Sequence, residues 1–91
     1  MVTMSVTGAQ YQRAEKVTSA QIRAARALLN WSVRDLAEKA GVHRNTITRA
    51  ESDRAAPGYA AATIRATIEK AGVEFIDPNG GGPGVRLRGG D

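Results

Sequence analysis

The sequence of 91 residues predicts a mainly α fold, with four to five helices followed by a short C-terminal β-hairpin. Apolar residues recur at helical spacing between residues 18 and 72, and polar capping residues precede two of these segments. Residues 73–91 alternate apolar and polar around a Gly-rich loop instead. Aromatic residues make up only 4% of the chain and many apolar positions are Ala, a composition that suits closely packed helices.

The first predicted helix follows a capping box. Thr18 can accept from the free amides, and Gln21 lies three residues later to reach back. Ile22, Ala25 and Leu29 then share one helical face. Arg26 lies on the same face, and a charge directed at a core needs a partner. Residues 1–17 show no sustained apolar period, so we expect a flexible N-terminal arm there.

The second predicted helix is short and has clear ends. Ser32 is a suitable N-cap with Asp35 three residues later, and Gly41 suits the left-handed conformation that ends a helix. The apolar face between them has i, i+3, i+4, i+7 spacing and consists of Val33, Leu36, Ala37 and Ala40.

The stretch "VHRNTITRAE", Val42 to Glu51, predicts a third helix with two different faces. At roughly 100° per residue, Ile47 and Ala50 point to one side. The opposite side carries the hydrogen-bonding side chains of Arg44, Asn45, Thr48 and Arg49. Two short helices joined by a tight turn at Gly41 have the form of a helix-turn-helix motif.

The remainder predicts one more helix and the hairpin. Pro57 lies in a loop, and the next helix runs from about Tyr59 to a stop at Gly72, with Ile64, Ile68 and Ala71 in register. The segments "VEFI" and "VRLR" have the period of strands. In the hairpin, we expect Val73 and Phe75 to share a face with Val85 and Leu87, and Glu74 to lie near Arg86 or Arg88.

The segment "IRAARALLNWSVRDLAEKAGVHRNTITRAES" resembles the phage repressor and Cro class of bacterial regulators, the XRE type, over about residues 19–72. The resemblance implies a repressor-like helix-turn-helix DNA-binding domain over 18–72, with the hairpin and tail at 73–91. It places Arg44, Asn45, Thr48 and Arg49 at the base-facing positions and His43 at the helix entrance. Periodicity selects the same four side chains, and Arg, Asn and Thr suit guanine, adenine and thymine edges.

A solvated helix face is the competing interpretation of these four residues, but the tight turn before them favours contact with the DNA groove. His43 is open to three interpretations: a helix cap, a phosphate contact or a base contact. Arg34 and Arg54 are candidates for phosphate contacts, with solvated surface as the alternative.

The resemblance also implies a structural ion pair. In this family an Arg of the first helix pairs with the Glu that ends the recognition helix, and here these positions carry Arg26 and Glu51. Two positions depart from the family. Val33 stands where Gln is frequent, so a phosphate anchor is missing, and Asp53 lies where Gly is favoured.

Charge and composition narrow the function. The formal net charge is +4, and Arg supplies most of the basic residues, which makes double-stranded DNA a candidate partner. With no Cys and a single His, the chain offers no Cys/His zinc site, so we expect no metal, no cofactor and no enzyme activity. It also lacks a long apolar run, so we expect no membrane partner and a cytoplasmic location.

We therefore expect a sequence-specific transcriptional regulator that reads the major groove with residues 43–52, acting as a homodimer. The edge from Val85 to Arg88 is a natural place for a second copy to pair. The alternative is a protein-binding module on the same fold, such as an antiactivator or the small partner of a two-protein switch, since fold alone does not determine function.

Overall fold

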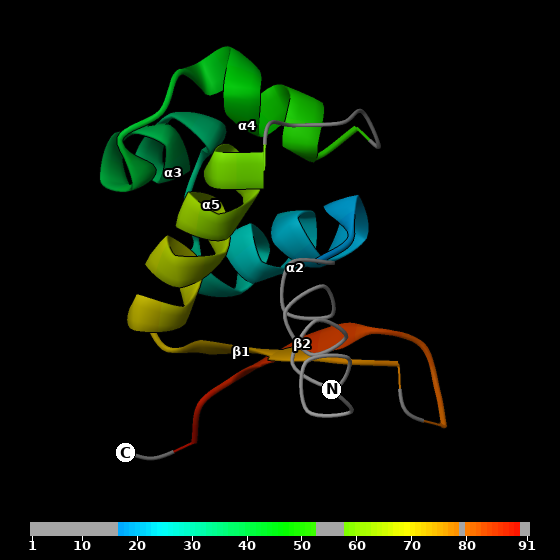
Figure 1. Ribbon diagram of the computed structural model, residues 1–91. Coiled ribbons are helices and arrows are strands. Elements are labelled where there is room, and N and C mark those ends of the chain that lie inside the picture. Colours follow the sequence, from blue (N-terminus) through cyan, green and yellow to red (C-terminus); the bar gives the residue numbers. More distant parts are fainter. Residues whose placement is uncertain (1–16, 53–57, 79, 90–91) are drawn as a thin grey trace, which may run out of the picture.

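The computed structural model describes residues 17–52, 58–78 and 80–89. Along the chain these form α2 (Ser19–Leu29), α3 (Val33–Ala40), α4 (Arg44–Ala50), α5 (Gly58–Lys70), β1 (Val73–Ile76) and β2 (Gly84–Leu87) (Figure 1). The mainly α fold with a C-terminal hairpin is thus confirmed. Residues 1–16 of the predicted arm, together with Asp53, Arg54 and Pro57, lie outside the described residues.

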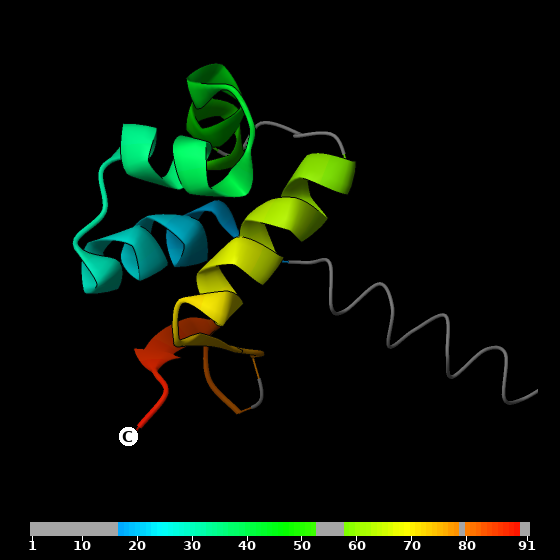
Figure 2. The same ribbon diagram turned by 90° about the vertical axis from the view of Figure 1, so that its left-hand side faces the viewer.

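The described elements form three levels, which both views show (Figures 1 and 2). Helices α3 and α4 lie at one end, α2 and α5 cross the middle, and the hairpin closes the opposite end. In Figure 2, β2 lies beneath α2 and β1 beneath α5, in agreement with the contacts between these elements. The helix-turn-helix pair is therefore separated from the hairpin by the middle level.

Local hydrogen bonds explain where the first helices begin and end. The capping box at Thr18 and the N-cap at Ser32 are confirmed: Thr18 Oγ1 accepts from the Gln21 N–H at 3.1 Å, and Ser32 Oγ accepts from the Asp35 N–H at 3.0 Å. Asp35 also completes a capping box with Ser32. Helix α2 ends at Asn30, which adopts φ +60°, and α3 ends at Gly41 with φ +70°. Both residue types tolerate this left-handed conformation better than most.

One hydrophobic core joins the helices to the hairpin. Its fully buried large side chains come from three helices and β1, and are Leu36, Ile47, Ile64, Ile68 and Val73. On α5 the buried face is formed by Ala60, Ile64 and Ile68. The prediction for Ala71 is wrong: the helix ends at Lys70, so Ala71 leaves the helical face and is exposed.

The hairpin has the expected antiparallel register. Val73 pairs with Leu87, Phe75 with Val85, and Glu74 with Arg86. Val73, Phe75, Val85 and Leu87 share one face of the hairpin, as expected. Val73 and Phe75 are buried beneath the helices, but Leu87 is 52% exposed. Both strands are edges of this two-stranded sheet, but β1 alternates buried and half-buried residues, whereas the last residues of β2 are exposed.

Candidate nucleic-acid interface

The turn between α3 and α4 sets the direction of the candidate recognition helix. After Gly41, the Val42 N–H donates to Ala37 O at 3.0 Å, which closes the end of α3. Helix α4 then lies against the core through Ile47, which is fully buried, and Ala50, which is 7% exposed. These two contacts leave the other side of α4 facing outward, as the sequence period predicts.

The structure brings the four predicted base-contacting residues together on this outward side. Arg44, Asn45, Thr48 and Arg49 are all exposed. None of their side chains is tied by a hydrogen bond or ion pair to another described residue. They are therefore free to meet a ligand, and the two guanidinium groups make this side of α4 positive.

His43 is the N-cap of α4. Its Nδ1 accepts a hydrogen bond from the Asn45 N–H at 3.0 Å, and its backbone is extended at φ −72° and ψ 150°. An accepting Nδ1 carries no proton, so in this geometry the neutral ring has its proton on Nε2. Among the described residues, no group of three His, Cys, Asp or Glu side chains is placed to hold a metal ion.

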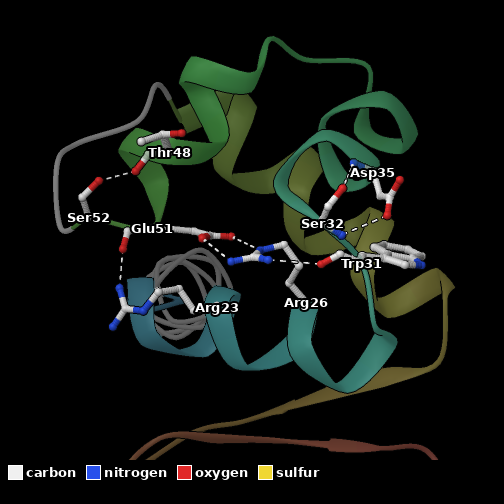
Figure 3. A network of polar contacts seen from close by, with 8 residues as sticks. All are labelled: Arg23, Arg26, Trp31, Ser32, Asp35, Thr48, Glu51 and Ser52. Carbon is white, nitrogen blue, oxygen red and sulfur yellow. Dashed lines mark hydrogen bonds and ion pairs between the residues drawn. The ribbon is translucent and has the colours of Figure 1, made fainter.

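Arg26 and Glu51 lie together directly behind α4 (Figure 3). Arg26 Nε is 2.8 Å from Glu51 Oε2 and Arg26 Nη2 is 3.0 Å from Oε1, a bidentate arrangement that fits both planar groups. The Glu51 side chain is only 8% exposed. The hydrogen bond to Glu51 raises the pKa of Arg26, although partial burial opposes the shift. The pair therefore links the middle of the molecule to the end of the candidate recognition helix.

Two more contacts hold this end of the helix, and neither was predicted. Arg23 donates to the backbone oxygen of Glu51, and the Ser52 hydroxyl donates to Thr48 O (Figure 3). Arg26 also donates to Trp31 O at 3.1 Å, on the connection that leads into α3. Helix α2 thus supports both the start of the helix-turn-helix segment and its end. The Arg23 contact joins residues 28 positions apart through a backbone oxygen, which leaves no signal in the amino-acid pattern.

Gln21 has a second role that its capping position does not reveal. Its Nε2 donates to Gly84 O at 2.8 Å and to Ile76 O at 3.2 Å, so one buried amide joins α2 to both strands. Its Oε1 accepts from the Thr18 N–H at 2.9 Å. The hairpin is thereby fixed to the middle level by hydrogen bonds as well as by apolar contacts.

Of the two candidate phosphate contacts, Arg34 and Arg54, the structure describes one. Arg34 is exposed in the first turn of α3, close to the Ser32 N-cap, whereas Arg54 lies outside the described residues. Val33, at the position where the family often has Gln, is half-buried and packs against the core instead. In the same turn the Ser32 backbone and side-chain hydrogen bonds lower the pKa of Asp35.

Comparison with known proteins agrees with this geometry. Residues 22–62 match the family model described as helix-turn-helix, a span that begins in α2 and ends in α5. No curated protein matches the chain. The fold and the match define residues 22–62 as a helix-turn-helix domain, and the match supports the XRE type that the resemblance implies. The match supports a DNA-binding helix-turn-helix regulator, a class that is typically non-enzymatic.

Within the residues that the structure describes, no helix is long and apolar enough to cross a bilayer.

Proposed function

We propose that this protein is a sequence-specific DNA-binding transcriptional regulator that inserts α4 into the major groove and acts as a homodimer. The observation that carries the proposal is the outward side of α4, where Arg44, Asn45, Thr48 and Arg49 are exposed together on a helix anchored by Ile47 and the Arg26–Glu51 pair. An α-helix fits the width of the major groove, where each base pair presents a distinct pattern of donors and acceptors.

Each exposed side chain of α4 has a specific DNA contact in this proposal. Arg44 and Arg49 donate to guanine O6 and N7, Asn45 pairs with adenine N6 and N7, and the Thr48 methyl contacts thymine. Arg34, on the preceding helix, binds a phosphate and positions the domain without reading sequence. Arg54 has the same proposed role, from a segment that the structure does not describe. His43 acts through the backbone of α4, as a positioning residue.

A selection from a pool of randomised duplexes tests the proposal. The protein is expected to enrich one short motif, with two half-sites related by two-fold symmetry if the dimer binds as a unit. Arg44→Ala and Asn45→Ala should enrich altered or weaker motifs, whereas Arg34→Ala should retain the motif and bind every duplex more weakly. Equal and weak binding to all sequences would overturn the proposal.

A protein-binding function is the second candidate, and one feature favours it. A shallow groove of about 490 Å³ lies between α3 and the C-terminal half of α5. It is lined by Trp31, Lys39, Thr63, Ala66, Thr67, Lys70 and Ala71, and the Lys39 ammonium lies 5.2 Å from the centre of the Trp31 ring. An apolar floor with two lysines suits a partner segment that carries apolar and acidic residues.

This second function makes a different prediction from the first. The protein would show no preferred duplex in the selection, and a purified partner would bind it with an affinity that falls in Lys39→Glu and Lys70→Glu. Partner binding unchanged by both charge reversals would reject the groove as the contact surface.

A further inference from the structure

The outer edge of β2 carries backbone groups that no described strand meets. The Arg88 N–H donates to Gly72 O at 2.7 Å, so residues 72 and 88 form a hydrogen-bonded pair of the antiparallel ladder. Such pairs alternate with pairs whose N–H and C=O groups point away from the partner strand. Val85 and Leu87 therefore direct their N–H and C=O groups to the outer edge, and the described sheet contains only β1 and β2.

The exposed side of α2 above this edge is apolar. Ala20, Ala24, Ala27 and Leu28 follow one another at i, i+4, i+7 and i+8, and all four are exposed. Leu28 comes seven residues after Gln21, so it shares the side of α2 from which Gln21 reaches the hairpin. Solvent-facing sides of helices usually carry polar residues, so this composition is unusual for a free surface.

Two large apolar side chains mark the surface where α2 meets β2. Leu28 is 41% exposed and Leu87 is 52% exposed, although Leu87 lies on the same face of the sheet as the buried Val73 and Phe75. We call the surface formed by Ala20, Ala24, Ala27, Leu28 and the outer edge of β2 the α2/β2 surface. Within the described part of the chain, it combines exposed apolar side chains with backbone groups that no strand pairs.

We propose that the α2/β2 surface pairs with the same surface of a second copy of this chain. Strand β2 runs antiparallel to the partner's β2, with Arg86 on the two-fold axis. Val85 then lies opposite the partner's Leu87, and Leu87 opposite the partner's Val85. These pairs exchange the outward N–H and C=O groups of both residues, and the two hairpins become one four-stranded sheet.

The residues around β2 favour this register over its neighbours. A shift toward the loop would place Leu87 opposite Pro83, which has no N–H to donate. A shift the other way would place Val85 opposite Gly89, beyond the end of the strand. In the chosen register the two Arg86 side chains face each other, but each already binds a Glu74 carboxylate at 3.0 and 3.3 Å, which offsets their repulsion.

The geometry of the fold explains why a second copy, and not a peptide of another protein, is the expected occupant. The two-fold axis of antiparallel strands in one sheet runs perpendicular to that sheet. The sheet closes the end of the molecule opposite α4, so rotation about this axis leaves α4 of both copies on the same side (Figures 1 and 2). This step rests on the proposed function, because two helices on one side match the two half-sites of a symmetric operator.

The area that a stable dimer needs also indicates which elements form the interface. Stable interfaces bury about 800 Å² on each partner, more than the edge of a strand as short as Gly84–Leu87 supplies. Helix α2 must therefore contribute, and it lies directly above β2 (Figure 2). Its alanines have small side chains, which let two such helices approach closely.

Cysteine cross-linking tests the register. The chain has no Cys, so a single introduced thiol reports on one position. Residues 86 of the two copies would form a non-hydrogen-bonded pair with Cα atoms about 4.5 Å apart, within the range for a disulfide. Arg86→Cys is expected to give a disulfide-linked dimer under mild oxidation, in the absence of DNA.

Glu74→Cys is the matched control. It lies opposite Arg86 on the same face of the sheet and breaks the same ion pair, but it is one strand farther from the axis. It should stay largely uncross-linked. Equal cross-linking in the two variants, or none with Arg86→Cys, overturns the proposed register.

Sedimentation of the unmodified chain and of two charged variants tests the surface itself. Leu87→Asp and Leu28→Glu are expected to raise the dimer dissociation constant at least about 10-fold, which corresponds to roughly 1.4 kcal/mol, while circular dichroism shows retained helix. Tyr59→Glu, on an exposed residue at the other end of α5, should change nothing. A monomer at the highest soluble concentration overturns the proposal, and so does a dimer that neither variant weakens.

These experiments contain no DNA, so they separate this proposal from the proposed function. A dimer that fails to select any duplex would leave the α2/β2 surface in place and reject DNA reading. A monomer that selects a motif would reject the α2/β2 surface and support DNA reading.

Discussion

At the scale of single residues, the Gln21 side chain makes three hydrogen bonds. Its amide caps α2 and holds both strands of the hairpin, and it is 5% exposed. Gln21→Met keeps the length of the side chain but removes every hydrogen bond, so the free energy of unfolding should fall by about 1 to 3 kcal/mol. Urea denaturation of both proteins measures the difference.

Thr18→Ala serves as the comparison for Gln21, because it removes the other hydrogen bond of the same capping box, from the Gln21 N–H to the Thr18 hydroxyl, and leaves the hairpin contacts in place. It should cost less than Gln21→Met. If the two variants lose the same stability, the contacts from Gln21 to the strands contribute nothing.

The Arg26–Glu51 pair gives a second prediction at this scale. Removing one partner leaves the other with an unpaired charge in a largely buried site, which typically costs several kcal/mol. Arg26 is 24% exposed, so we expect Arg26→Met to cost about 3 kcal/mol, at the lower end of that range. The double variant Arg26→Met/Glu51→Leu should lose clearly less than the sum of the single variants. Additive losses in urea denaturation would contradict a direct interaction.

Asp35 predicts how stability depends on pH. Its carboxylate accepts from the Ser32 N–H at 2.9 Å, and the Ser32 hydrogen bonds lower its pKa in the folded protein. A lowered folded pKa contributes stability above the unfolded value of about 3.9, and this contribution is lost as the pH falls through the folded pKa. Wild type should therefore exceed Asp35→Asn in stability at neutral pH, with the difference shrinking at acid pH.

Urea midpoints measured at neutral pH and in acid check this prediction. Glu74→Gln should behave in the same direction, because Arg86 lowers the pKa of Glu74. A difference between wild type and Asp35→Asn that stays constant with pH would mean that the charge of Asp35 plays no part in the capping box.

At the scale of elements, α4 depends on a cap that also lies beside the proposed DNA surface. His43→Ala removes the acceptor for the Asn45 N–H and should cost about 1 kcal/mol of stability. His43→Asp restores an acceptor, so its stability should match or exceed that of wild type. Its negative charge, however, should weaken binding to every duplex.

Thermal unfolding and duplex binding, measured on wild type and on the Ala, Asp and Ser variants of His43, separate the two effects. His43→Ser is the neutral control, since it keeps an acceptor without adding charge. Should His43→Asp bind DNA as tightly as His43→Ser, the entrance of α4 does not approach the phosphate backbone.

Short-range patterns in the sequence predicted the elements correctly. The capping boxes at Thr18 and Ser32 and the left-handed stop at Gly41 depend on residues three or four positions apart, where local chemistry decides the outcome. The period of α4 likewise predicted which residues are buried and which are exposed, because Ile47 and Ala50 repeat at helical spacing.

Contacts between distant residues could not be predicted in this way. Gln21 meets Ile76 and Gly84, which are 55 and 63 positions away, through backbone oxygens that every residue possesses. The alternating pattern of the hairpin correctly placed Leu87 on the same face as Val73, but it did not show that the helices cover one strand more fully than the other. That difference arises from the placement of α2 and α5 over the sheet.

At the scale of the whole molecule, the proposed DNA surface and the proposed dimer surface lie at opposite ends. Helix α4 faces outward at one end, the hairpin closes the other, and α2 makes hydrogen bonds to both through Arg26 and Gln21 (Figure 1). In the proposed dimer, the α2/β2 surface leaves both copies of α4 on the same side, as the two half-sites of a symmetric operator require.

The most direct test of the proposed DNA-reading role is the ratio of affinities for the selected duplex and for a scrambled one, measured at one salt concentration. Asn45→Ala removes the proposed adenine contact, so the ratio should fall roughly 5- to 150-fold, which corresponds to about 1 to 3 kcal/mol. The variant leaves the net charge unchanged, so binding to the scrambled duplex should stay the same. Thr63→Ala, a neutral change on the exposed side of α5, should leave the ratio as in wild type. An unchanged ratio in Asn45→Ala, Arg44→Ala and Arg49→Ala would contradict the claim that α4 reads the sequence.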